Sequence, residues 1–204
     1  VMGSASIFGM FAGVYHWFPK MFGRYMNHKL GYLHFWLTFA AVYLVFFPMH
    51  FMGIDGVPRR YYSFTSFETF NEWVDLNTFI SLAAILGFIA QFIFVYNFFK
   101  SMFGGEKASR NPWKSNTLEW TTPEVMPGHG NWPGAIPEVK RWAYDYSHPD
   151  VTADYIPQTL SDEDLKKGVE YDREDYNPLE HQEGIGGETE HEAGETTKEE
   201  ETTH

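Results

Sequence analysis

The sequence predicts an all-α membrane protein, with three transmembrane helices followed by an extended arm and an acidic tail. The main evidence is two long stretches, residues 30–54 and 76–99, that contain no Asp, Glu, Lys or Arg. A helix rises about 1.5 Å per residue, so each stretch can cross a hydrocarbon core of about 30 Å. A buried helix of a soluble protein would usually show a polar face, and these stretches have none.

A third helix is expected at the start of the sequence. Residues 1–19 are also uncharged, and the spacing of Gly9 and Gly13 would let another helix backbone approach closely in lipid. This stretch has no initiator methionine, basic start or A-x-A site, so it is not interpreted as a signal peptide. The expected spans are therefore about 1–19, 30–54 and 76–100, inside a transmembrane part of 1–104.

Charged residues beside these spans predict their orientation. The connection 20–29 contains Lys20, Arg24 and Lys29 and no acid, and the stretch after residue 100 is also rich in cations. The loop 55–75 carries four acids against two arginines. By the positive-inside rule, the two basic stretches face the cytoplasm and the loop faces outward.

The remainder of the sequence is predicted to lack long regular elements. Residues 105–160 read as an extended cytoplasmic arm, because five prolines between residues 112 and 137 exclude a long helix or a central strand. Residues 161–204 read as an acidic, disordered tail. Residues 160–204 hold 16 acids and 4 bases, which accounts for the entire net charge of −12. Too little apolar surface is present there to offset the conformational entropy of the chain.

Composition excludes several kinds of site. No cysteine is present, so disulfides, thiolate metal sites and a cysteine nucleophile are ruled out in this sequence. No two of the nine histidines lie three or four residues apart, so no metal site is predicted. An acidic protein without a basic cluster is not expected to bind nucleic acid. His34 and His50 lie within a span, where ionisable groups are functional candidates, but the simpler interpretation is a hydrogen-bonded histidine near each membrane face.

The pair Arg59-Arg60 is the sharpest chemical feature of the sequence. It lies on the outer side, where the positive-inside rule disfavours cations. A guanidinium presents a rigid fork of donors that matches a carboxylate, so the pair suggests a fixed anionic partner. Spacing alone leaves a solvated loop pair as an equal alternative.

Four strings together resemble a known family in their order and spacing. They are His16-Trp17-Phe18-Pro19, Phe46-Phe47-Pro48-Met49-His50-Phe51-Met52-Gly53, Val57-Pro58-Arg59-Arg60-Tyr61 and Asn116-Thr117-Leu118-Glu119-Trp120. On these strings, residues 1–135 resemble subunit I of the heme-copper cytochrome c oxidases. That subunit is a twelve-helix bundle, and the resemblance covers its last three helices and C-terminal arm. The sequence is therefore expected to be a C-terminal fragment.

The resemblance implies an oxidoreductase of a respiratory electron-transport chain that reduces dioxygen and translocates protons. It implies two hemes and copper in the complete subunit, with ligands upstream of Val1, so no catalytic residue and no metal ligand are expected here. By matching position, Arg59 and Arg60 would pair with heme propionates, and Val1, Met2 and Ala5 would line the heme edge. The fragment alone is not expected to be active.

The resemblance also implies partners and a location. The partners would be the remaining helices of subunit I, oxidase subunits II and III, cytochrome c as electron donor, and membrane lipid. The location would be a bacterial inner (cytoplasmic) membrane, with the C-terminal tail in the cytoplasm. Two alternatives remain: a quinol-oxidising member of the same superfamily, and a non-catalytic membrane scaffold or assembly subunit with an acidic interaction tail.

Overall fold

The computed structural model describes residues 2–64, 67–123, 125, 129–132, 134–146, 148–149, 151–172 and 176–177. Every regular element in these ranges is a helix, which confirms the predicted all-α fold. The chain divides into two compact units. Unit 1 consists of Val1–His16 and Arg24–Glu106, and unit 2 of Trp17–Gly23 and Lys107–His204.

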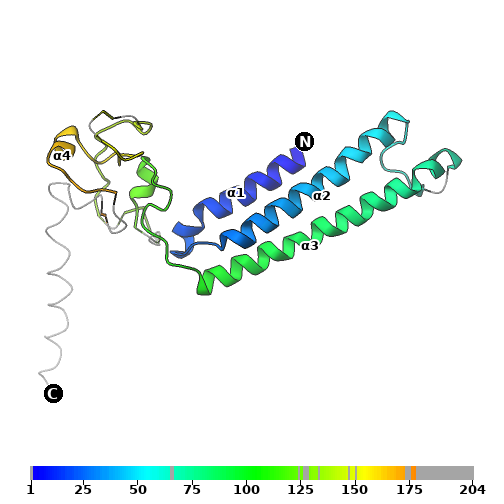
Figure 1. Cartoon of the computed structure of the whole chain (residues 1–204), viewed down its shortest axis with the longest axis horizontal. Coiled ribbons are helices and arrows are strands. Elements are labelled where there is room, and N and C mark those ends of the chain that lie inside the picture. Colours follow the sequence, from blue (N-terminus) through cyan, green and yellow to red (C-terminus); the bar gives the residue numbers. More distant parts are fainter. Residues whose placement is uncertain are drawn as a thin grey trace, which may run out of the picture. The chain divides into compact units, whose positions relative to one another are not determined.

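Unit 1 is built on two long helices, α2 (His28–Ile54) and α3 (Val74–Gly104), which run side by side in opposite directions (Figure 1). Small residues let them approach, since a Cβ on Gly87 would lie 3.0 Å from the Cβ of Ala41. At about 1.5 Å per residue, α2 is about 40 Å long. Among the described residues, α2 and the helix that ends at Gly104 are long and apolar enough to cross a membrane.

Side-chain hydrogen bonds join α2 to α3 at two levels. Gln91 bonds to His34 Nε2 at 3.2 Å and donates to Thr38 Oγ1 at 3.2 Å. Nearer the helix ends, Asn97 accepts from the backbone N–H of Asn27 at 3.2 Å and donates to its carbonyl at 3.1 Å. Within lipid, polar groups need protein partners, and each interhelical bond contributes about 0.6–2 kcal/mol. These bonds therefore fix the register of the pair.

Helix α1 (Met2–Phe22) contacts this pair through aromatic rings. Phe8 lies edge-on to Phe35 with centroids 5.9 Å apart, and Phe11 lies 4.6 Å from Phe94. A Cβ on Gly9 would meet nothing within 4 Å, so the predicted close approach of a backbone at Gly9 is not made within the described residues. α1 is not among the helices that meet the length and hydropathy criterion for a span, and its role as a third span stays a prediction.

Unit 2 is organised around the last turns of α1. Phe18 is fully buried, and Lys20 is 4% exposed. The Lys20 ammonium donates to the carbonyl oxygens of Arg110, Thr122 and Pro123 at 2.8, 2.8 and 2.9 Å. These three bonds use all the donors of the lysine and fasten residues 110–123 to the helix.

The helix extends beyond the predicted end at residue 19. Pro19 has no N–H to donate, but its carbonyl still accepts from Gly23 N at 2.7 Å. The proline therefore does not stop the helix, and Lys20 lies on α1 rather than in a connecting loop.

The later part of unit 2 folds back instead of extending away. The fully buried Asn116 accepts from Ile156 N at 2.8 Å through Oδ1, and its carbonyl accepts from Gln158 N at 3.1 Å. An apolar cluster then forms from Tyr155, Ile156, Leu160, Tyr171 and Tyr176. Burial and the charge of Asp172 raise the pKa of Tyr155, whose hydroxyl donates to the Tyr171 carbonyl at 2.9 Å.

This arrangement differs from the predicted boundary between arm and tail. Composition predicts a disordered tail from residue 161, yet residues 161–172 contain α4 (Asp162–Lys166) and part of the apolar cluster. The apolar residues of this stretch lie among acidic ones, so its average composition does not indicate that they can pack together. Residues 178–204, the rest of the predicted tail, lie outside the described residues.

Candidate functional site

The loop between α2 and α3 carries the predicted arginine pair, and its two ends are tied together. α2 ends at Ile54, and Gly56 follows with a φ of +88°, which glycine adopts without steric cost. The indole of Trp73, the last residue of η2 (Glu68–Trp73), donates to the Asp55 carboxylate at 2.8 Å. Residues 56–64 and 67–72 therefore lie between two ends that a hydrogen bond joins.

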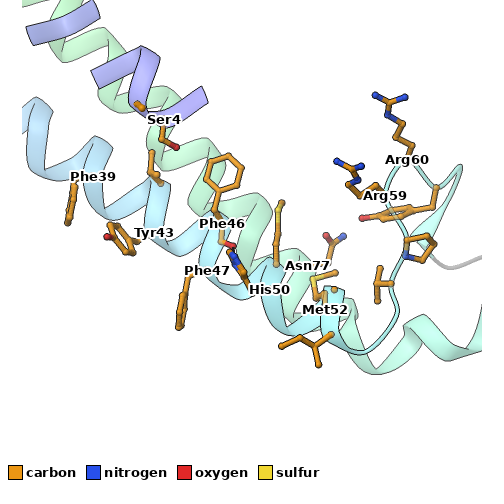
Figure 2. A pocket seen from close by; sticks show the side chains of 18 of the residues that line it. Ser4, Phe39, Tyr43, Phe46, Phe47, His50, Met52, Arg59, Arg60 and Asn77 are labelled. Atoms are coloured by element: carbon orange, nitrogen blue, oxygen red, sulfur yellow. Dashed lines mark hydrogen bonds between the residues drawn. The ribbon is translucent and has the colours of Figure 1, made fainter. Parts of the chain in front are cut away.

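Arg59 and Arg60 are both exposed on this loop, and Figure 2 shows their side chains extending from it. Within the described part of the chain, neither guanidinium has an ion pair or a hydrogen bond. Arg60 has a φ of +61°, a left-handed conformation that costs a non-glycine residue about 1–2 kcal/mol. Tyr61 packs next to it against Phe64 and Phe70, with centroids 5.3 and 6.1 Å apart. The loop thus presents two positive charges from a fixed backbone.

A pocket of about 1070 Å³ lies beside the arginine pair. Helix α1 contributes Ser4, Ala5 and Phe8, and helix α2 contributes aromatic and aliphatic side chains that include Phe46 and Phe47. Figure 2 shows Tyr43, Phe46, Phe47 and His50 along α2, with the two arginines at one end. The pocket therefore combines apolar walls with a cationic rim.

His50 was not predicted to belong to this pocket, although the sequence marks it as an ionisable residue within a span. Its side chain lines the pocket, and its Nδ1 donates to the Phe46 carbonyl in the preceding turn of α2 at 2.8 Å. That bond agrees with the interpretation of His50 as a hydrogen-bonded histidine.

Comparison with known proteins identifies the family. Residues 1–106 of the 204 match the family described as Cytochrome C and Quinol oxidase polypeptide I, a range that includes the whole pocket. The chain belongs to this family. Together with the two apolar helices, that membership makes it a membrane protein.

Three relatives show how much of an oxidase subunit the chain represents. An alternative cytochrome c oxidase subunit 1 of Bradyrhizobium diazoefficiens is 48% identical over 159 residues, which are 78% of this chain and 27% of that protein. The cytochrome c oxidase subunit 1 of Synechocystis is 46% identical over 122 residues, or 60% of this chain and 21% of the relative. That of Cereibacter sphaeroides is 39% identical over 132 residues, or 63% and 22%. The chain thus spans about a quarter of the length of these oxidase subunits.

The structure brings together three of the five residues predicted to contact a cofactor. Ala5, Arg59 and Arg60 all line the pocket beside the arginine pair. Met2 is 84% exposed and does not line it. Val1 lies outside the described residues.

The described residues contain no group of three or more His, Asp or Glu side chains placed to hold a metal ion. At the pocket, the guanidiniums of Arg59 and Arg60 can recognise an anion next to an apolar body.

Proposed function

We propose that the chain is the C-terminal part of the catalytic subunit of a proton-pumping heme-copper oxidase, which reduces dioxygen to water with electrons from cytochrome c. The observation that carries this proposal is the pocket with Arg59 and Arg60 at its rim, in a chain of the oxidase family. The complete subunit would hold two hemes and copper, with ligands supplied by residues outside this chain.

The side chains at the pocket fit the propionate-bearing edge of a heme. A heme is a large apolar ring system with two carboxylates on one edge. The walls that include Phe46 and Phe47 suit an apolar body. The guanidiniums of Arg59 and Arg60, which pair with no described residue, suit carboxylates. Ala5 on α1 is small enough to let such a group approach the helix.

In this proposal, the two arginines position and stabilise the propionates. Each guanidinium favours the ionised form of a carboxylate close to it. When bound, the heme supplies the iron that accepts and passes on electrons. Two fixed positive charges near that iron favour its reduced form, so Arg59 and Arg60 raise the midpoint potential of the heme. The same charges lower the proton affinity of the propionates.

Cytochrome c is the proposed electron donor. The family includes both cytochrome c and quinol oxidases, but all three relatives described above are named cytochrome c oxidase subunit 1. The proposed partners are the remaining helices of subunit I, oxidase subunits II and III, and lipid. A non-catalytic scaffold gives no reason for two arginines, without a partner in the described part of the chain, at the rim of an apolar pocket.

The orientation is proposed from charge. Arg24, Lys29 and Lys100 lie at the end of the α2–α3 pair where α2 begins and α3 ends. The positive-inside rule places this end in the cytoplasm of a bacterium, with the later part of the chain, and places Arg59 and Arg60 on the outer side.

A visible absorption spectrum of the native complex that contains this chain, with its subunit composition, tests the function. We expect heme bands that change when reduced cytochrome c is added, and a copper-bearing partner subunit. A complex without heme would contradict the oxidase proposal and support the scaffold. Heme bands that respond to quinol but not to cytochrome c would identify the quinol-oxidising alternative.

A further inference from the structure

A second, smaller pocket lies where α2 begins and α3 ends, and the proposed heme site does not use it. Its volume is about 180 Å³, several times the share of about 30 Å³ that one water molecule takes in the liquid. It is lined by Asn27, His28, Lys100, Ser101, Gly104 and Glu106, among others. The pocket is therefore large enough for a small polar group.

Backbone and side-chain hydrogen bonds hold the walls of this pocket in place. Tyr25 N donates to the Glu106 carbonyl at 2.8 Å, and Arg24 Nη1 donates to the Gly105 carbonyl at 2.5 Å. Ser101 donates to Asn97 at 3.1 Å and accepts from Asn27 N at 3.2 Å. These bonds join the start of α2 to the end of α3 around the pocket.

The pocket contains charges of both signs that no other described residue neutralises. Lys100 and Glu106 both line it, and neither side chain has an ion pair with another described residue. The Lys100 ammonium lies over the ring of Tyr96, 5.5 Å from its centroid. A ligand that carries both a cation and an anion would satisfy Lys100 and Glu106 at once.

The position of the pocket along the helices indicates where such a ligand comes from. α2 is about 40 Å long, longer than a hydrocarbon core of about 30 Å, and its first turn carries the charged Lys29, which places that turn at the level of the lipid headgroups. Tyr25 lines the pocket at that level, as aromatic residues do at membrane interfaces. Cations in pockets between transmembrane helices bind the phosphates of lipid headgroups on the cytoplasmic side, where the proposed orientation puts Lys100.

We propose that this pocket binds the headgroup of a membrane phospholipid of the phosphatidylethanolamine class. The phosphate accepts hydrogen bonds from Lys100, and the primary ammonium donates to the Glu106 carboxylate. A phosphatidylglycerol headgroup has no cation for Glu106. A phosphatidylcholine headgroup has a cation without an N–H to donate. The pocket therefore selects by the ammonium and not by net negative charge.

Lipid counting on the assembled complex tests this site. The purified complex in mild detergent is titrated with phosphatidylethanolamine, phosphatidylglycerol and phosphatidylcholine of identical acyl chains, and bound lipids are counted by native mass spectrometry. Glu106→Gln should weaken the binding of one phosphatidylethanolamine about fivefold without weakening phosphatidylglycerol. Lys100→Gln should weaken both. Glu163→Gln and Lys166→Gln, exposed residues of α4, are matched controls and should change neither.

Two results would overturn the proposal. If neither Glu106→Gln nor Lys100→Gln changes lipid counts, the pocket binds no headgroup. If Lys100→Gln weakens phosphatidylglycerol while Glu106→Gln leaves phosphatidylethanolamine unchanged, the site takes anionic lipid and the ethanolamine assignment is wrong. A heme spectrum from the same samples reports separately on the proposed oxidase function.

Discussion

Two sets of cations in this chain are used in opposite ways. Lys20 of unit 2 is 4% exposed, and its ammonium donates to three carbonyl oxygens 2.8–2.9 Å away. Arg59 and Arg60 of unit 1 are exposed and have no protein partner among the described residues. A cation whose donors are all taken by the backbone stabilises the fold. A cation with free donors on a fixed loop is available to a ligand.

The comparison predicts different consequences for the two sets. Replacing Lys20 should destabilise unit 2 with or without a cofactor, because its partners are carbonyls of the chain itself. Replacing Arg59 or Arg60 should leave the fold intact and change the properties of the ligand. Stability and redox measurements therefore separate the two roles.

The largest expected effect on stability comes from Lys20→Met, which keeps the length of the side chain and removes its donors. Three carbonyls around a buried site then lose a charged donor, and a bond to a charged group contributes about 1.5–3 kcal/mol. We expect a loss of about 3 kcal/mol, measured by thermal unfolding of the complex and by faster protease cleavage within residues 107–123. Lys167→Met, at an exposed position, is the control. Equal protease resistance of both variants would show that Lys20 does not fasten this segment.

Asn116→Ala should have the next largest effect. The side chain is fully buried, accepts from Ile156 N at 2.8 Å and donates to the Asp145 carbonyl at 3.0 Å. Its removal leaves a buried N–H without a partner, at a cost of about 2 kcal/mol. Hydrogen exchange at Ile156 should accelerate accordingly, whereas the exposed Asn131→Ala should leave it unchanged. Unaltered exchange in Asn116→Ala would mean that water replaces the amide without loss.

The smallest effect is expected at the start of α4. Asp164 accepts from Ser161 Oγ at 2.7 Å and from Ser161 N at 2.9 Å, and these bonds hold the pKa of Asp164 below its ordinary value of 3.8. Because folding lowers this pKa, the stabilisation is fully present above pH 3.8. It is lost as the pH falls through the pKa that Asp164 has in the folded protein. We expect the amide protection of α4 to decline below about pH 4, by about 1 kcal/mol. Asp164→Asn should abolish that decline, and an identical pH profile in wild type and variant would rule out this cap.

The sequence predicted the membrane part of unit 1 well because its signal is local. Long uncharged stretches mark α2 and α3 whatever packs against them, and the predicted spans 30–54 and 76–100 lie inside the observed helices. Arg59 and Arg60 could be singled out because two adjacent cations are unusual on the outer side of a membrane. Their place beside an apolar pocket needed the structure, since Ala5 and the arginines are about 55 residues apart in sequence.

Unit 2 was harder to predict because its contacts join residues distant in sequence. Lys20 and Thr122 are separated by 102 positions, and no local pattern relates them. The uncharged stretch ends at residue 19, so charge alone places Lys20 in the connection 20–29. Ile156 and Leu160 are buried in a cluster with Tyr155, Tyr171 and Tyr176, whereas composition alone predicts that residues 105–160 form an extended arm.

Redox titration of the arginine variants tests the central claim most directly. In the complete oxidase, Arg59→Gln and Arg60→Gln each remove a positive charge beside the propionates, which favours oxidised iron and tighter proton binding by the propionates. We expect lower heme midpoint potentials in both variants. Arg60→Lys should lower them less, because the positive charge stays while the fork of donors is lost. The control Lys166→Gln should leave them unchanged. Unchanged midpoints and unchanged proton pumping in both glutamine variants would contradict the account and leave Arg59 and Arg60 as solvated cations that contribute about 0–1 kcal/mol.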